Sequence, residues 1–350
     1  VRRGSALPAP PPGHGVGQPR NRLMPPTASV IIAPTRLIAA RMYSWPAKAA
    51  MQHPHNIPDF PCPSNTVSNG QTMIVSSAVT VPCVRVESGG TLDLRSGGKL
   101  FACHVFGLAG SSMTGGTSSA PISNAEIVIR NCPIDTSIDP EQYGRGLVWM
   151  GSVRLHGTPL LTWTRLMGEP LAGQSALTLS EAATGWKAGD TLIIPGTTQG
   201  YSTQWETPTV SGVNGAAVTL AGNLQFSHRG ARDADNVIRF LPHVGNLSRS
   251  IVIRSEDPNV RGHVMFTGDA NVDVRYVRFQ DLGRTTFQPI DNTDVNSGHI
   301  GTNQIGRYAV HFHHAFKAAH QFIGNSVDGS TKGCLVIHNT HFSTFRDNVC

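Results

Sequence analysis

The chain has 350 residues, of which only 14% are charged, and its formal net charge is +6. The excess positive charge lies in residues 1–50, because the basic and acidic residues of 51–350 nearly balance. A nearly neutral folded part argues against a nucleic-acid partner, whose binding surface would gather basic residues on one face. The sequence also lacks an apolar run long enough to cross a bilayer, so we expect no membrane span.

Residues 1–58 are rich in Pro, Ala and Arg and include the run Pro10-Pro11-Pro12. Segments of this composition bury little apolar surface, which predicts a disordered leader. The alternative is that they precede the true start of the protein. Because the chain begins at Val1 and stops at Cys350 inside a repeat, we interpret it as a fragment truncated at its C-terminus.

The next region, residues 59–173, contains two turns of the same composition, Ser88-Gly89-Gly90 and Ser96-Gly97-Gly98. Gly adopts the positive φ of tight turns without steric cost, and the flanking residues alternate as short strands do. Further strands are predicted at 125–130 and 147–155. We expect a β-rich domain that passes into the first rungs of a solenoid.

Residues 174–228 have a different sequence pattern, which predicts short apolar strands at 176–179 and 217–220. The string Val213-Asn214-Gly215 is a hairpin signal. This segment is predicted to be a small β-rich insertion that interrupts the solenoid.

Residues 229–350 contain a repeat. The phrase Val310-His311-Phe312-His313-His314 returns as Leu335-Val336-Ile337-His338-Asn339, a shift of 25, and Phe322–Asn325 returns as Phe345–Asn348, a shift of 23. Steps of this size are typical of the rungs of a parallel β-helix. No single rung can bury its apolar face alone, so stacking must stabilise the fold. The predicted class is all-β, a parallel β-helix with a small β-rich insertion.

The chain has six cysteines, and none belongs to a Cys-x-x-Cys pair, which argues against a structural zinc site. An even number of spaced cysteines fits an exported protein with disulfides. Buried free thiols are an equally ordinary alternative.

The repeat also carries candidate chemistry. In a strand, His311 and His313 point to the same face, and His338 holds the place of His313 one rung later. Neighbouring imidazoles can transfer protons or contact a substrate, and His313 with His338 could bind a metal ion. The structural alternative is a His/Asn ladder that joins the rungs by hydrogen bonds.

Carboxylates near the predicted solenoid strand Val272–Phe279 are a second group of candidates. A glycosidase needs two carboxylates, whereas a β-helix lyase uses a base and a cation that stabilises the sugar carboxylate. Turn capping and surface ion pairs are the structural alternative for these residues. The candidate catalytic residues are Asp269, Asp281, Arg307, His311, His313 and His338, with Asp273 a weaker one.

Substrate contacts and a cation site complete the candidates. Aromatic rings stack on the apolar faces of sugars, and Tyr201 and Trp205 lie in a polar stretch. Asp233 and Asp235 could hold calcium through oxygen ligands, although a turn explains the same pattern. The candidate substrate-binding residues are Arg284, Tyr201, Trp205 and Tyr308.

Several short motifs occur in a specific order. They are Leu155-His156-Gly157-Thr158-Pro159 with Trp163–Leu166, Trp186–Asp190, Glu206–Leu220, Gly262–Met265, Gly306–His313 and His338–Val349. Over residues 62–350 this order resembles proteins with an eight-glycine ("G-eight") domain followed by right-handed parallel β-helix repeats. That group includes cell-surface hyaluronidases, cell-migration-inducing hyaluronan-binding proteins and fibrocystin-like proteins.

The resemblance implies a right-handed, pectate-lyase-like β-helix in an extracellular or cell-surface protein, with residues 59–173 containing the G-eight-like domain. It also implies a polysaccharide ligand of the hyaluronan type, with calcium as a possible cofactor. We therefore expect a monomeric carbohydrate-active protein that binds or depolymerises an acidic polysaccharide, as a glycosidase or a lyase. The alternatives are a non-catalytic adhesion module and a structural stalk of a larger surface protein.

Overall fold

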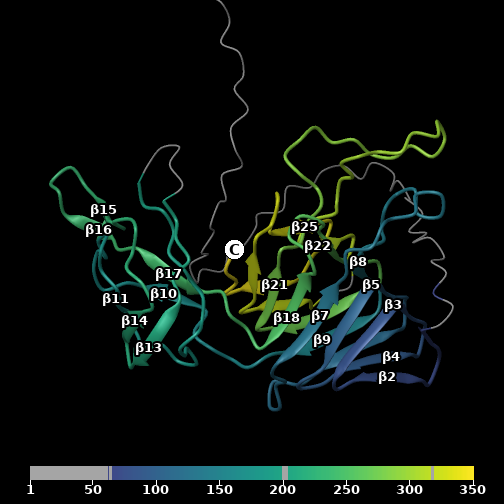
Figure 1. Cartoon of the computed structure of the whole chain (residues 1–350), viewed down its shortest axis with the longest axis horizontal. Coiled ribbons are helices and arrows are strands. Elements are labelled where there is room, and N and C mark those ends of the chain that lie inside the picture. The colour runs from purple at the N-terminus through teal and green to yellow at the C-terminus, as the bar shows by residue number, and fades with distance from the viewer. Residues whose placement is uncertain (1–61, 63–64, 199–203, 317–318) are drawn as a thin grey trace, which may run out of the picture.

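The computed structural model describes residues 62, 65–198, 204–316 and 319–350, and the regular structure in these ranges consists of β-strands. The predicted leader, residues 1–58, and the candidate Tyr201 lie outside the described residues. Most strands wind into a coil at one end of the molecule, and the remainder form a separate module (Figure 1).

One side of the coil is a seven-stranded parallel sheet, to which successive turns of the chain each contribute a strand. In spatial order the strands are β2 (Thr72–Val75), β4 (Thr91–Leu94), β6 (Ser112–Gly115), β9 (Ser152–His156), β20 (Asn271–Arg275), β23 (Gln321–Ile323) and β26 (Thr344–Arg346).

An eleven-stranded parallel sheet forms the other two sides, because its long strand β5 (Lys99–Gly107) pairs with a different strand at each half. The β7 side consists of β7 (Ala125–Ile129), β18 (Ile251–Ser255), β21 (Val277–Gln280) and β24 (Ser326–Asp328). The β8 side consists of β8 (Gly146–Trp149), β19 (Val264–Thr267), β22 (Val310–His313) and β25 (Leu335–His338). Before β5 the sheet continues with β3 (Ala78–Val86) and β1 (Thr66–Val67).

Each turn of the coil visits the seven-stranded sheet, the β7 side and the β8 side in that order, as β20, β21 and β22 do. Parallel strands joined in this way form a parallel β-helix, whose crossovers are right-handed by the general chirality of such connections. The register confirms the predicted steps: His313 pairs with His338, and Phe322 pairs with Phe345.

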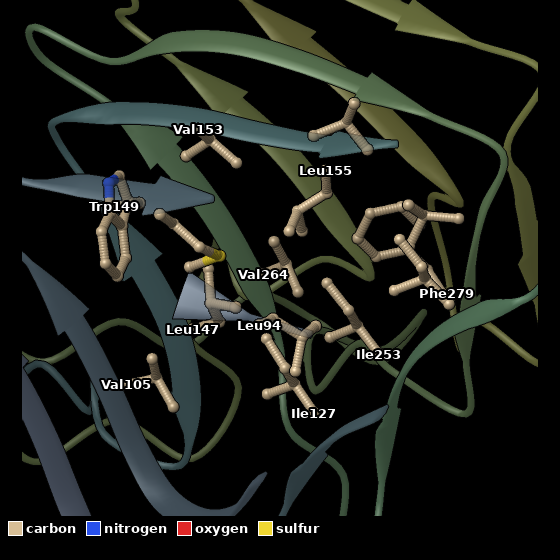
Figure 2. Close-up of a cluster of buried hydrophobic side chains, with 14 of the residues drawn as sticks. Leu94, Val105, Ile127, Leu147, Trp149, Val153, Leu155, Ile253, Val264 and Phe279 are labelled. Atoms are coloured by element: carbon tan, nitrogen blue, oxygen red, sulfur yellow. The ribbon is translucent and has the colours of Figure 1, made fainter. Parts of the chain in front are cut away.

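The core of the β-helix is apolar because the three sides point alternate residues inward. Figure 2 shows the convergence: Leu94 and Val153 come from the seven-stranded sheet, Ile127 from the β7 side, and Leu147 and Val264 from the β8 side. All five are buried. Further along the axis, Phe312 contacts the rings of Phe266 and Phe322, so aromatic stacking continues the core.

Sharp corners divide two segments that the sequence predicts as single strands. The predicted strand Val272–Phe279 is β20 and β21, separated by Tyr276 with φ of 55°. The predicted strand 147–155 is β8 and β9. Apolar alternation continues through a corner because both flanking strands face the same core, so periodicity alone does not reveal the bend.

Between β9 and β18 the chain leaves the coil and forms the separate module, with antiparallel pairing throughout. A buried cluster that includes Leu177, Leu192 and Val218 is its own core. Its strands are β10 (Trp163–Arg165), β11 (Ala176–Thr178), β12 (Leu192–Ile193), β13 (Val210–Asn214), β14 (Ala217–Leu220), β15 (Ala231–Arg232), β16 (Ile238–Phe240) and β17 (His243–Asn246).

The module is wider than the predicted segment 174–228. The predicted hairpin at Val213-Asn214-Gly215 joins β13 to β14, but β10 before the segment also pairs with β17 after it. This closing pair is long-range, so local sequence patterns do not show it, and the coil resumes only at β18. The module contacts the last rungs, where Arg249 Nε donates to Gly324 O at 2.7 Å and Ser326 Oγ donates to Leu247 O at 2.7 Å.

All six cysteines form disulfides, which decides between the two sequence interpretations. Cys62 pairs with Cys83 near the first rungs. Cys103 in β5 pairs with Cys132, which follows β7. The Cys334–Cys350 disulfide joins the start of β25 to the last residue of the chain.

Candidate functional site

The outer face of the β8 side carries a column of stacked residues. Pairing between the strands aligns Phe106, Val148, Met265, His311 and Val336 on successive rungs. Three of the first four are apolar although they point away from the core, which requires a cover. The fourth is His311, and the fifth, Val336, is apolar again.

Two loops cover the early part of this column. The loop between β7 and β8 places Tyr143 against the cluster of Phe106, Val148 and Met265. The loop between β21 and β22, which runs through residues 281–309, folds back on itself through bridges from Asp291 to Asn303 and from Asp294 to His299.

Arg307 joins the two loops. Its guanidinium lies 4.1 Å from the centre of the Tyr143 ring, and it donates to the carbonyl oxygens of Glu141 at 2.6 Å and Gln142 at 3.1 Å. The residue is only 6% exposed, and this burial lowers the pKa of its guanidinium. Arg307 therefore stabilises the cover rather than presenting its charge to solvent.

Arg284 has a similar place. Its Nη2 donates to Gln142 O at 2.5 Å and Gly144 O at 2.9 Å, and it lies 3.4 Å from His263 Nδ1. Burial, with the neighbouring charge of Arg307, lowers the pKa of Arg284 to about 9. Both predicted arginines thus donate hydrogen bonds to backbone carbonyls of the covering loop.

Asp139 is the acidic partner of this group, and its side chain is fully buried. The carboxylate accepts hydrogen bonds from the backbone N–H groups of Tyr143 at 2.8 Å and Gly144 at 2.7 Å. Burial raises its pKa, against the opposing effect of those hydrogen bonds and of Arg307. We call Asp139, Tyr143, Arg284 and Arg307 the arginine clasp. Sequence analysis missed Asp139 and Tyr143, for which the one local signal is an Asp at the start of a turn.

Beyond the clasp, three histidines meet on β22 and β25. His313 Nδ1 lies 3.2 Å from His338 Nδ1, and one ring nitrogen from each of His311, His313 and His338 lies within 4.8 Å of the others. Exposure increases outward: His311 is buried, His313 is half-buried and His338 is exposed. The register of β22 and β25 thus brings together all three predicted histidines.

In His311, the buried histidine, one ring nitrogen forms a hydrogen bond and the other does not. His311 Nδ1 donates to Gly306 O at 2.9 Å, whereas His311 Nε2 is buried without a hydrogen-bond partner. Burial lowers the pKa of His311 to about 4, partly offset by the Gly306 contact. At neutral pH this imidazole is therefore uncharged, with its lone pair on Nε2.

The neighbouring column continues the contacts between rungs. His314 Nε2 accepts from Asn339 Nδ2 at 3.1 Å, beside the His313–His338 contact. These are the contacts of the predicted His/Asn ladder. Rings extend the surface: Tyr308 lies edge-on to His311 at 5.2 Å, and Phe316 lies 5.7 Å from His314. We define the histidine face as His311, His313, His314 and His338 with Tyr308, Phe316 and Phe342.

Two of the predicted carboxylates, Asp273 and Asp281, lie away from this face, whereas Asp269 follows β19, whose Thr267 pairs with His313. Asp269 lies in the exposed turn between β19 and β20. Asp273 is on β20, where it pairs with Arg275 at 2.6 Å and lies 3.0 Å from His156 Nε2. Asp281 follows β21, where Arg261 and Gln280 contact its carboxylate. One rung passes around three sides of the coil, so residues that are close in sequence lie on different sides.

Two other predicted sites lie in the separate module. Both carboxylate oxygens of Asp233 are engaged, one by the N–H groups of Asp235 and Val237 and the other by Arg239 at 2.6 Å. This arrangement is the capped turn of the structural alternative, with both Asp233 oxygens already accepting hydrogen bonds. Trp205 is exposed, but in the module rather than beside the histidines.

The fold and this surface define the class: a parallel β-helix protein with a histidine-rich face at its C-terminal rungs. No protein-family profile matches the chain. The chain is similar to fibrocystin-L of Mus musculus, with 26% identity over 322 residues, and to fibrocystin-L of Homo sapiens, with 26% identity over 323 residues. Each alignment covers 81% of this chain and 8% of the relative, so the chain spans a small part of the relatives it matches.

Among solved structures the chain matches phage tailspikes. The tailspike gp61 of Pseudomonas phage phi297 is 12% identical, with a TM-score of 0.25 over 77% of this chain and 40% of that one. The Gp54 tailspike of Acinetobacter baumannii bacteriophage AP22, solved with a capsular saccharide, is 12% identical, with a TM-score of 0.24 over 75% and 41%. Overlaps this low carry no argument. In the described part of the chain, no helix could span a membrane.

Proposed function

We propose that this protein is an extracellular carbohydrate-active protein that binds or depolymerises an acidic polysaccharide at the histidine face. The observation that carries the proposal is the charge of the open rungs. Residues 295–327 and 329–346 contain no Asp or Glu, whereas they include Lys332, Arg346 and the histidine cluster. Asp328 and Asp347 are the acidic residues of 295–350, and they lie on β24 and after β26 rather than on β22 or β25. A surface rich in hydrogen-bond donors suits an anionic polymer.

Exposed rings support a sugar ligand. Phe316 is 62% exposed and Phe342 is 78% exposed, on the turns that follow β22 and β25. Rings on consecutive rungs can stack on consecutive sugars of an extended chain, because a solenoid presents its sites along one axis. Hyaluronan is the proposed type of polymer because the motif order resembles that of cell-surface hyaluronidases.

Three disulfides support an extracellular location, because disulfides persist in oxidising compartments. Calcium stays a proposal that rests on the resemblance alone, since both Asp233 oxygens already accept hydrogen bonds. The non-catalytic module remains the second candidate. It is favoured by the dispersal of Asp269, Asp273 and Asp281, which leaves no pair of these carboxylates at the histidine face.

The experiment is incubation of the purified chain with hyaluronan and other uronic-acid polymers, with and without calcium. New reducing ends indicate hydrolysis, absorbance of an unsaturated uronide indicates lyase action, and retention on a glycan column without cleavage indicates binding alone. The absence of all three on every polymer would contradict the proposal.

Two variants locate the site. Phe316→Ala with Phe342→Ala should weaken glycan binding about 2- to 10-fold per ring, the range expected for lost ring stacking. The matched control is Phe240→Ala, because Phe240 is 70% exposed but lies in the separate module. Equal effects of the two changes would rule out the histidine face as the site.

A further inference from the structure

The geometry points to a second property of the histidine face: we propose that His311, His313 and His338 bind a zinc-class divalent metal ion. Within the described residues, these three are the one group of His, Cys, Asp and Glu side chains placed closely enough to share an ion. This inference does not depend on the proposed glycan function, because it concerns the ligand atoms alone.

The spacing of His313 and His338 fits tetrahedral coordination. Zinc–nitrogen bonds of about 2.0–2.1 Å at a tetrahedral angle hold two ligand nitrogens about 3.3 Å apart. The Nδ1 atoms of His313 and His338 are 3.2 Å apart. In a plain ladder one of these atoms must carry a proton toward the other, whereas a shared ion would accept both lone pairs.

The buried member is oriented as metal-binding histidines usually are. Such a histidine donates its second ring N–H to a carbonyl or carboxylate, which fixes the tautomer and the ring. His311 Nδ1 donates to Gly306 O at 2.9 Å, which leaves the Nε2 lone pair as the ligand. That Nε2 is buried without a hydrogen-bond partner, a cost that a bound ion would remove.

The donor set selects the class of ion. Three imidazoles suit zinc and its transition-metal neighbours, whereas calcium and magnesium prefer oxygen ligands. Three protein ligands leave a fourth position for water or a ligand oxygen, as in open zinc sites. The exposed side of His338 places that position toward solvent and the proposed glycan surface.

A conservative variant separates the metal site from the ladder. Asn already follows His in the adjacent column, where Asn339 contacts His314 at 3.1 Å, so His338→Asn keeps a ladder contact and removes an imidazole. The matched control is His341→Asn, an exposed histidine outside the group.

The experiment is zinc titration of the chelator-treated full chain, with bound metal counted after dialysis and Co²⁺ used as a spectroscopic probe. We expect one equivalent of zinc, the visible bands of a four-coordinate Co²⁺ ion, and no competition by calcium. Loss of a direct ligand should weaken zinc binding at least as much as the roughly 10- to 100-fold cost of losing an outer contact, so His338→Asn should lose at least about 10-fold.

Two results would overturn the inference. One is a folded wild-type chain that retains no zinc, and the other is zinc binding equal in His338→Asn, His341→Asn and wild type. Thermal unfolding of the variants confirms folding, and glycan binding measured on the same samples keeps the two proposals separate.

Discussion

The β8 side contains two regions that share strands and register but differ in everything outside the sheet. Over the early rungs the outward column is apolar and lies under Tyr143, with the arginine clasp closing the loops. Over the last rungs the outward residues of β22 and β25 are His311, His313, Val336 and His338, and His338 is exposed. The strands therefore fix where each outward side chain lies, whereas the connecting loops decide which of these side chains a ligand can reach.

The two regions also differ in the polar groups that they bury. In the clasp, buried charges are tied to backbone carbonyls and N–H groups, so the polar atoms stabilise the cover. At the histidine face, a buried imidazole nitrogen has no partner. Buried nitrogens without a partner occur at Arg284 Nε and His263 Nε2 as well, so the meeting of three histidines, and not the unpartnered nitrogen alone, distinguishes the histidine face.

The largest expected effect is in the covered region. Arg307→Met should lower the free energy of unfolding by about 3–5 kcal/mol, because it removes a buried cation and the Arg307 donor to the Glu141 carbonyl, while Gln142 O keeps only Arg284. Thermal or chemical denaturation measures the loss. Arg95→Met is the control: Arg95 forms an exposed pair with Asp93, and its loss should cost less than about 1 kcal/mol. Similar losses of stability in both variants would contradict the stabilising role of the arginine clasp.

The second effect compares two disulfides. Replacing Cys334 and Cys350 with Ser opens a 16-residue closure and should destabilise the protein by about 3 kcal/mol. The Cys103–Cys132 disulfide, with a separation of 29 residues, should cost a similar amount. Only the first replacement should also weaken zinc binding, because Cys334 precedes β25. If zinc binding falls equally in both variants, zinc binding does not depend specifically on the disulfide beside β25.

The third effect is a pH dependence in the covered region. Burial lowers the pKa of His104 from 6.5 to about 4. Between these values the unfolded chain holds a proton that the folded chain does not, so stability falls as pH falls from 6.5 toward 4. The contribution of His104 should drop by about 2 kcal/mol between pH 7 and pH 5.

In the wild type, the backbone N–H of Arg145 donates to His104 Nδ1 at 2.6 Å. The measurement is denaturation at both pH values for wild type and for His104→Gln, whose amide oxygen can still accept from that N–H. The variant should lose less stability on acidification than the wild type. His341→Gln, an exposed control, should behave as wild type. An identical loss in all three proteins would contradict the assignment to His104.

The smallest effect is in the open region. His313→Ala removes a half-buried contact to His338 and should lower stability by no more than about 1 kcal/mol. Met265→Ala, in the covered column one rung earlier, should cost about 2–4 kcal/mol, because it leaves a cavity under Tyr143. Thermal unfolding of the two variants ranks them, and a reversed order would show that the covered and open regions are misassigned.

The repeat made much of the β-helix predictable. The shifts of 25 and 23 residues equal the pairing of His313 with His338 and of Phe322 with Phe345, because stacked rungs must repeat their apolar positions to share one core. The meeting of His311, His313 and His338 follows from the same register. The ends of the separate module were not predictable in this way, because β10 and β17 pair across most of its length.

The sequence by itself determined the fold class, the rung length and the common face of the histidines, since these depend on periodicity along the chain. The tertiary structure decided the rest. It placed Asp281 on a side away from His311, tied Arg284 and Arg307 to the loop of Asp139, and left His311 Nε2 without a partner. Those outcomes depend on how long loops cross the outside of the coil, and no repeat in the sequence encodes that path.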